Sequence, residues 1–377
     1  MIIFQRDIEE RIRERLFGKD MLIIFGPRQA GKTILVKKIV GEFGDEGAYY
    51  DCTIALVREH FVEGKPDALL PLTHGKKVVV FDEAQTIQNI GAILKVFHDT
   101  YPGVQVIATG SSSFDLANKV VEPMTGRAIE FTLLPLSLSE IAHHKNVTRA
   151  DLDLLMQYGS YPRIVAATTV SEKEDAIKSI ATNYLYKDVF TFEAIRNPRI
   201  FEDLVKALAL QIGSTVSLNE LAQTVGATRA TINRYLRLLE QAFIVRRVHS
   251  FSNNPRTELK KVFKVYFLDL GVRNALVDIA TPVVERTERG HLFENFFVTE
   301  RMKVGTLQTF PPDIMFWRTR AGLEIDVVEK SGPNIRAYEC KWSPQDVSFA
   351  SFLKKYPAAH TRVITPDVLV ENTHTST

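Results

Sequence analysis

The chain has 377 residues, with 47 Lys and Arg against 45 Asp and Glu and a formal net charge of +2. This length predicts two to four domains, and the near-neutral charge excludes nucleic-acid binding through bulk charge, so any such binding needs a local basic patch. The apolar runs are shorter than a membrane span, no signal-peptide core is present, and the two cysteines are far apart, so we expect a cytoplasmic protein without membrane segments or disulfides.

Residues 1–136 alternate apolar, strand-like runs with stretches of helical periodicity. This alternation is typical of a parallel sheet covered by helices, and the near-continuous hydrophobicity of the runs suits strands that are buried on both faces. The expected strands are Met21–Phe25, Ala48–Cys52, Val78–Asp82, Val104–Thr109 and Ile129–Leu133.

A phosphate-binding loop follows the first of these strands and precedes a predicted helix. It fits the pattern G-x-x-x-x-G-K-[ST], in which backbone N–H groups and a helix N-terminus surround a polyphosphate. Lys32 is placed to reach the β- and γ-phosphates, and the Thr33 hydroxyl is placed to hold Mg²⁺. The predicted loop residues are Gly26, Pro27, Arg28, Gln29, Ala30, Gly31, Lys32 and Thr33. The sequence therefore predicts binding of a nucleoside triphosphate with Mg²⁺.

Two further strand ends carry candidate hydrolytic residues. Val78–Asp82 ends at Asp82, which can hold Mg²⁺ through water, and Glu83 can then orient and deprotonate the attacking water. Ser111 follows the next strand and is a candidate contact to the γ-phosphate or the water, although a plain serine-rich turn is the alternative. Arg127 is a candidate arginine finger for a neighbouring subunit in an oligomer, and Arg163 a candidate sensor; each is equally explained as a surface or packing arginine.

The middle of the chain contains two predicted segments. Residues 137–205 are expected to form a helical lid interrupted at Gly159-Ser160-Tyr161-Pro162, and residues 206–268 a winged helix-turn-helix. The predicted second helix of that motif has one apolar and one basic face, which is the composition of a helix that enters a DNA groove. The candidate DNA-binding residues are Arg229, Thr231, Arg234 and Arg237, with Arg256, Lys260 and Lys261 in the predicted wing. The alternative is a helix-turn-helix used only for structure or protein contact.

Residues 269–377 are expected to form a mixed α/β domain with a second site. Asp326 and the pair Glu339 and Lys341 lie on adjoining predicted strands, and Glu294 lies on a predicted helix that can reach them. Two carboxylates can bind Mg²⁺ or Mn²⁺ beside a scissile phosphate, and the lysine can position the nucleophilic water. The layout is similar to that of the PD-(D/E)xK nuclease superfamily, although no proline precedes Asp326.

The whole chain resembles a family of AAA-type P-loop ATPases of bacteria and archaea that carry a C-terminal domain of unknown function. Besides the phosphate loop, the resemblance rests on Phe81-Asp82-Glu83-Ala84-Gln85, Thr109-Gly110-Ser111, Gly126-Arg127, Leu134-Pro135-Leu136-Ser137 and Gly159-Ser160-Tyr161-Pro162. It implies an α/β fold with a P-loop NTPase parallel sheet, a helical lid, a winged helix-turn-helix and a restriction-endonuclease-like C-terminal domain.

The expected function is an ATPase that binds and hydrolyses ATP with Mg²⁺ and acts on DNA. The alternative is an NTP-driven switch whose C-terminal domain binds a protein partner and cleaves no nucleic acid. The two hypotheses differ in what they expect of Glu339 and Lys341, because only a nuclease loses metal-dependent cleavage when these residues are replaced.

Overall fold

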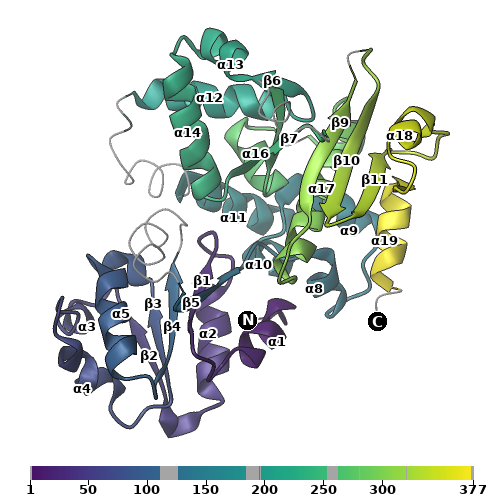
Figure 1. The fold of residues 1–377 in the computed structure, drawn as a ribbon. Helices are drawn as coiled ribbons and strands as arrows, with labels where there is room; N and C mark the ends of the chain where they lie inside the picture. Colours follow the sequence, from purple (N-terminus) through teal and green to yellow (C-terminus); the bar gives the residue numbers. More distant parts are fainter. Residues whose placement is uncertain are drawn as a thin grey trace. The chain divides into compact units, whose positions relative to one another are not determined.

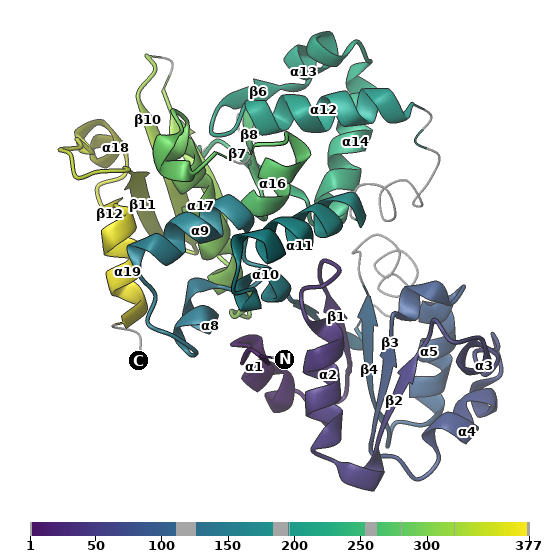
Figure 2. The ribbon, with the colours of Figure 1, turned by 180° about the vertical axis from the view of Figure 1, so that it is seen from behind.

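The computed structural model describes residues 2–110, 126–183, 195, 197–252, 262–279, 281–319 and 321–374. The chain forms two compact units, Met1–Leu136 and Ser137–Thr377. Figures 1 and 2 show the elements of each unit from opposite sides. Every helix in the described part of the chain is too short or too polar to cross a membrane.

The first unit is built on a five-stranded parallel sheet in the order β2-β3-β4-β1-β5. Its helix α2 follows β1 and packs across β2, β3 and β4. The strands are β1 Met21–Phe25, β2 Gly47–Asp51, β3 Val78–Asp82, β4 Gln105–Gly110 and β5 Ala128–Thr132, and the longer helices are α1 Ile8–Glu14, α2 Lys32–Gly41 and α5 Ile90–Thr100. Two short helices, α3 Ala55–Arg58 and α4 Leu70–Thr73, lie between β2 and β3 along the chain.

The five predicted strands are confirmed. The ranges of β1 and β3 match the prediction, and those of β2, β4 and β5 differ from it by one residue at each end. Every residue of β1, β3 and β4 is buried, which explains why continuous apolar runs predicted these strands well. Because the strands are parallel, β1, β3 and β4 all end at one edge of the sheet.

The second unit begins with helices and a small antiparallel sheet in the order β6-β8-β7. The helices are α8 Leu138–Ala142, α9 Arg149–Tyr158, α10 Pro162–Ala166, α11 Val170–Asn183, α12 Pro198–Leu210, α13 Leu218–Val225 and α14 Arg229–Gln241. The strands are β6 Thr215–Ser217, β7 Val245–His249 and β8 Val262–Phe267.

A four-stranded mixed sheet in the order β12-β11-β10-β9 completes the second unit. The pairs β9–β10 and β10–β11 are antiparallel, whereas β11 and β12 are parallel. The elements are α16 Leu270–Leu276, α17 Arg289–Thr306, β9 Asp313–Arg318, β10 Glu324–Ser331, β11 Asn334–Cys340, α18 Ala350–Lys355, β12 His360–Ile364 and α19 Pro366–His374.

The interruption predicted at Gly159-Ser160-Tyr161-Pro162 is the point where the N-terminal helices of the second unit contact α16. Asp269 precedes α16, and its carboxylate accepts hydrogen bonds from the backbone N–H of Ser160 at 2.8 Å and of Val272 at 3.1 Å. A single hydrophobic cluster contains Ile180, Leu236 and Val272, one residue from each of the three predicted segments 137–205, 206–268 and 269–377. These segments therefore share a core within one compact unit.

Gly159 allows the close approach to Asp269, and its replacement tests this contact. Its φ is +92°, and an added Cβ would lie 2.1 Å from Asp269 Oδ1. We expect Gly159→Ala to reduce the free energy of unfolding of the second unit by about 3 kcal/mol, because backbone strain and steric overlap add. Both tryptophans, Trp317 and Trp342, belong to this unit, so urea unfolding followed by tryptophan fluorescence measures it selectively.

Gly226→Ala is the matched control for this experiment. Gly226 also has a positive φ, +69°, but an added Cβ there meets no atom within 4 Å. Only backbone strain of about 1 kcal/mol is expected in this variant. Equal urea midpoints for the two variants would show that the Asp269 contact does not limit position 159.

Candidate functional site

The phosphate loop requires glycine at its first and sixth positions. Gly26 has a φ of +151°, and an added Cβ would lie 2.1 Å from the carbonyl oxygen of Leu133. Gly31 has a φ of +103° and is the N-cap residue of α2. The loop therefore turns directly from the end of β1 into the N-terminus of α2, where backbone N–H groups favour an anion.

Lys32 lies at the start of α2 and is buried. Its Nζ donates hydrogen bonds to the carbonyl oxygens of Gly26 at 2.8 Å and Pro27 at 2.9 Å. The Lys32 ammonium group, which is predicted to bind phosphate oxygens, therefore lies within the phosphate loop.

The Asp82 carboxylate at the end of β3 joins the loop to two other strands. Its Oδ2 accepts hydrogen bonds from Thr33 Oγ1 at 2.7 Å and from the Tyr49 hydroxyl at 2.6 Å. Its Oδ1 accepts a hydrogen bond from Thr109 Oγ1 at the end of β4. Asp82 is only 2% exposed, and these three hydroxyl groups satisfy a carboxylate that would otherwise be costly to bury.

Glu83 follows Asp82 in a left-handed backbone conformation, with φ +54° and ψ +39°. Its backbone N–H donates to Thr109 Oγ1 at 3.1 Å, and its Oε2 accepts from Gln85 Nε2 at 2.5 Å. A non-glycine residue in this conformation is uncommon and is often found where a side chain must be aimed at a functional site. The turn places Glu83 directly beside the Asp82 network.

Arg127 does not lie near the loop of its own chain, and Ser111 lies outside the described residues. Ala128 pairs with Met21, so Arg127 is at the start of the strands, whereas Gly26 follows their end. Five residues at about 3.3 Å each separate these positions by roughly 16 Å. The Arg127 guanidinium instead contacts Asp99 Oδ1 at 2.8 Å, and this hydrogen bond lowers the pKa of Asp99.

Arg163, the candidate sensor, is an exposed residue of α10 in the second unit.

Sequence reasoning missed two members of the Asp82 network. Thr109 has a sequence signal, because it ends the apolar strand that follows β3 along the chain. Tyr49 has none, because its contact with Asp82 depends on the pairing of β2 with β3 over 33 residues of sequence.

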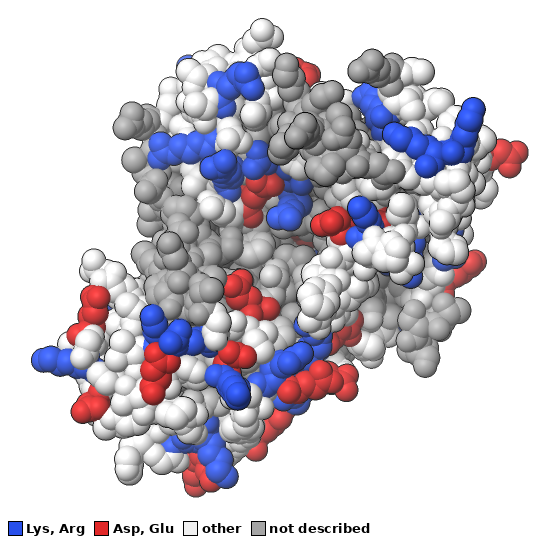
Figure 3. All heavy atoms as spheres, in the orientation of Figure 1, with Lys and Arg blue, Asp and Glu red and all other residues white. Residues whose placement is uncertain are grey.

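The basic face predicted for α14 is exposed. Arg229, Arg234 and Arg237 are exposed, while Ile232, Leu236 and other apolar residues of the helix are buried. Lys and Arg side chains gather over the region of α13 and α14 (Figure 3). The fourth candidate, Thr231, is half-buried, and its backbone N–H donates to the Thr228 side chain at 3.2 Å. Position 231 therefore participates in the cap of α14. The predicted wing residues Arg256, Lys260 and Lys261 lie outside the described residues.

The four predicted residues of the C-terminal site lie close together. Lys341 Nζ is 2.6 Å from Glu339 Oε2 and 3.8 Å from Asp326 Oδ2, which also accepts the backbone N–H of Cys340 at 2.9 Å. Burial, together with the negative charges of Glu294 and Glu339, raises the pKa of Asp326 to about 7. Both glutamates thus act on Asp326 through their charge, and we call these three residues the C-terminal carboxylate cluster.

Two residues of β8 that sequence reasoning missed bind Glu294. Lys264 Nζ is 2.8 Å from Glu294 Oε1 and 2.6 Å from Glu324 Oε1, and the Tyr266 hydroxyl donates to Glu294 Oε1 at 2.5 Å. Lys264 is 1% exposed. Within the described ranges, no group of three or more His, Cys, Asp or Glu side chains is arranged to hold a metal ion.

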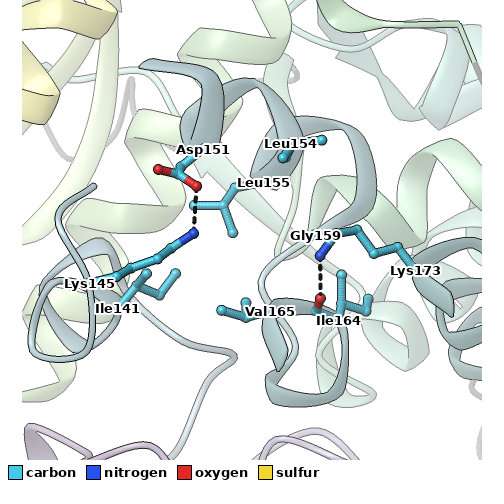
Figure 4. A pocket seen from close by; sticks show the side chains of 9 residues that line it. All are labelled: Ile141, Lys145, Asp151, Leu154, Leu155, Gly159, Ile164, Val165 and Lys173. Atoms are coloured by element: carbon cyan, nitrogen blue, oxygen red, sulfur yellow. Dashed lines mark hydrogen bonds and ion pairs between the residues drawn. The ribbon is translucent and has the colours of Figure 1, made fainter. Parts of the chain in front are cut away.

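A separate pocket lies among α8, α9, α10 and α11 (Figure 4). Its two lysines are engaged, because Lys145 Nζ contacts Asp151 Oδ1 at 2.5 Å and Lys173 Nζ donates to the carbonyl oxygens of Ile164 at 3.0 Å and Ala167 at 2.6 Å. Burial lowers the pKa of Lys173. These contacts hold the helices together. They also account for the two lysines that line the pocket, so no ligand is needed to explain their presence.

Three family models match successive parts of the chain. Residues 18–142 match an AAA domain, residues 149–282 match a domain of unknown function (DUF8612), and residues 289–376 match another domain of unknown function (DUF4143). The chain therefore contains an AAA-type ATPase domain, which agrees with its parallel sheet and phosphate loop.

Similar proteins come from bacteria and archaea. An uncharacterised protein of Mycobacterium tuberculosis is 26% identical over 336 residues, which cover 88% of this chain and 73% of that protein. An uncharacterised protein of Methanocaldococcus jannaschii is 23% identical over 349 residues, which cover 86% and 74% of the two chains.

Solved structures with distant similarity include two ATP-related proteins. A signal transduction ATPase with numerous domains from Pyrococcus horikoshii has a TM-score of 0.31 and 12% identity, over 80% of this chain and 46% of that chain. AMPPCP-bound DnaA from Aquifex aeolicus has a TM-score of 0.29 and 14% identity, over 62% and 86%. The chain thus spans less than half the length of the first of these structures.

Proposed function

We propose that the chain is a magnesium-dependent ATPase. In this proposal, ATP hydrolysis in the first unit drives the second unit, which binds DNA. The observation that carries this proposal is the hydrogen bond of 2.7 Å between Thr33 at the end of the phosphate loop and Asp82 at the end of β3. The loop supplies anion-binding N–H groups, and Asp82 and Glu83 supply the carboxylates that hydrolysis requires.

The residues at this edge of the sheet suit Mg²⁺. Thr33 Oγ1 and the Asp82 carboxylate are oxygen donors, which this hard cation prefers. When bound, Mg²⁺ neutralises phosphate charge and orients the transferred phosphoryl group. Thr33 and Asp82 are the residues that would hold it, Thr33 directly and Asp82 through water.

Each remaining residue has a role set by its position. Lys32 binds the β- and γ-phosphate oxygens once its ammonium group leaves the carbonyl oxygens of Gly26 and Pro27. Glu83 orients the attacking water and accepts its proton. Thr109 hydrogen-bonds both the Asp82 carboxylate and the Glu83 backbone. It therefore fixes the position of Asp82, which would face the metal, relative to Glu83, which would face the water.

Variants at Lys32 and Glu83 test the ATPase proposal. We expect Lys32→Ala to abolish retention of labelled ATP. Glu83→Gln should retain Mg-ATP but lower kcat at least roughly 100-fold, because it removes the general base and keeps the side-chain shape. The measurements are filter binding and steady-state phosphate release.

Glu59→Gln is the control, because Glu59 is an exposed carboxylate next to α3 in the same unit. It should behave as the wild type in both assays. Equal turnover by Lys32→Ala and wild type, or a wild-type protein that retains no nucleotide, would refute the ATPase proposal.

The DNA-binding part of the proposal concerns α12, β6, α13, α14, β7 and β8, which follow one another in the order expected of a winged helix-turn-helix. The short turn at Gly226 joins α13 to α14, and the antiparallel pair β7–β8 follows α14. The exposed arginines of α14 supply positive charge on the helix that would enter a groove.

Charge removal from α14 tests DNA binding. We expect the double substitution of Arg229 and Arg237 by Gln to lower the affinity for duplex DNA and to reduce the slope of log K against log salt by about 2, because each phosphate contact contributes about 0.9. The control replaces Lys354 and Lys355, two exposed residues of α18, by Gln. Binding that is insensitive to salt, or equal slopes for the two double variants, would contradict groove contact.

The C-terminal carboxylate cluster favours a second candidate function, nucleic-acid cleavage. The order α17, β9, β10, β11, α18, β12 carries Glu294, Asp326, Glu339 and Lys341, as a PD-(D/E)xK nuclease would require. Carboxylates are suitable ligands for Mg²⁺ or Mn²⁺, but the described residues hold no ready set of three ligands, so we assign no reaction step to a metal here. The competing proposal is a domain that binds a protein partner and cuts nothing.

Cleavage of plasmid DNA with Mg²⁺ or Mn²⁺ separates these alternatives. A nuclease should lose cutting at least roughly 100-fold in Lys341→Ala while ATP turnover stays at the wild-type rate, because the two sites are in different units. Lys355→Ala should cut as the wild type does. A wild-type protein that hydrolyses ATP but leaves DNA intact with both metals would exclude cleavage and favour the partner-binding domain.

A further inference from the structure

Tyr49 contributes a hydroxyl group to the nucleotide site from outside the phosphate loop. It lies on β2, opposite Val80 in the parallel pair with β3, and its side chain extends towards the end of β3. The hydroxyl donates to Asp82 Oδ2 at 2.6 Å, and Thr33 Oγ1 donates to the same oxygen at 2.7 Å.

The phenol is fixed as a donor. Lys37 Nζ of α2 lies 4.4 Å from the centre of the Tyr49 ring, which gives a cation–π contact on the side of the helix. An ionised carboxylate has no proton to donate, so the hydrogen bond runs from the Tyr49 hydroxyl to Asp82.

The three hydroxyl groups on Asp82 differ in what else they do. Thr33 is the hydroxyl proposed to hold Mg²⁺, and Thr109 also accepts the Glu83 backbone N–H. Tyr49 belongs to a strand with no proposed contact to the nucleotide. The hydrogen bond from Tyr49 to Asp82 can therefore persist when Thr33 turns towards a metal. Tyr49 then holds Oδ2 of the carboxylate, and Thr109 holds Oδ1.

We infer that Tyr49 is a positioning residue that fixes the Asp82 carboxylate in the orientation required for Mg²⁺. This inference rests on the proposed ATPase function and deepens it. Partners that orient a metal-binding group usually affect metal affinity 10- to 100-fold when they are removed. Loss of the Tyr49 hydroxyl should accordingly weaken Mg²⁺-dependent steps and leave metal-free nucleotide binding unchanged.

The chain offers a matched control at the next position. Tyr50 points to the opposite face of β2, and its hydroxyl donates to the carbonyl oxygen of Leu72 at 2.8 Å. Like Tyr49, it is half-buried, and burial raises its pKa. Tyr50→Phe thus removes one hydroxyl and one hydrogen bond from the same strand without touching Asp82.

The experiment titrates Mg²⁺ into each full-length protein with a fluorescent ADP analogue and follows the nucleotide signal. We expect the half-saturating Mg²⁺ concentration to rise roughly 10-fold in Tyr49→Phe and to stay at the wild-type value in Tyr50→Phe. Affinity for the analogue in EDTA should be the same in all three proteins, which also shows that each variant is folded.

The outcomes separate this inference from the ATPase proposal. A Tyr49→Phe titration that overlays the wild-type curve, an equal shift in Tyr50→Phe, or tighter Mg²⁺ binding would each overturn the role of Tyr49 while wild-type nucleotide binding stands. A wild-type protein that binds the analogue neither with nor without Mg²⁺ would instead refute the ATPase proposal, and with it the role of Tyr49.

Discussion

The first unit depends on one buried carboxylate and its three hydroxyl partners. Asp82 lies at the end of β3, which lies between β2 and β4 in the sheet, and its charge would be costly to bury without partners. Hydroxyl groups from the loop, from β2 and from β4 remove that cost, and each of them comes from a segment that the parallel sheet brings to the same edge. The requirement to satisfy Asp82 therefore also fixes the relative positions of the groups that would bind and hydrolyse a nucleotide.

A second buried carboxylate has a comparable role in the other unit. Asp269 caps α16 and accepts the Ser160 N–H, so it joins the helices before β6 to the elements after β8. Gly159 leaves no room for a side chain at this contact. A lid that moved independently of α16 would have to break these bonds and expose Tyr161 and its apolar neighbours, so motion of α9 and α10 is expected to carry α16 with it.

The sequence predicted contiguous features better than features formed by contact. The apolar runs of β1 and β3 and the spacing between Gly26 and Lys32 are local patterns, so both were predictable without a fold. The basic face of α14 is local as well. Tyr49 and Lys264 reach partners that are 33 and 30 residues away, and neither residue type signals such a contact. Arg127 lies at the other end of the strands from the loop of its own chain, so its predicted role at the nucleotide of a neighbouring subunit stays a prediction.

The charge balance of the C-terminal cluster makes it dependent on β8. Among the described residues, the carboxylates of Glu294, Glu324, Asp326 and Glu339 face the ammonium groups of Lys264 and Lys341. Arg318 also contacts Glu324, and His291 also contacts Glu294. Burial, and then the charges of Glu294 and Glu339, raise the pKa of Asp326. Removal of Lys264 would take away the positive charge beside Glu294 and Glu324, and would leave Glu294 with the Tyr266 hydroxyl, also from β8, and His291 as partners. Because β8 pairs with β7, the strand after the basic helix α14, any displacement of that small sheet would change the electrostatics of the cluster.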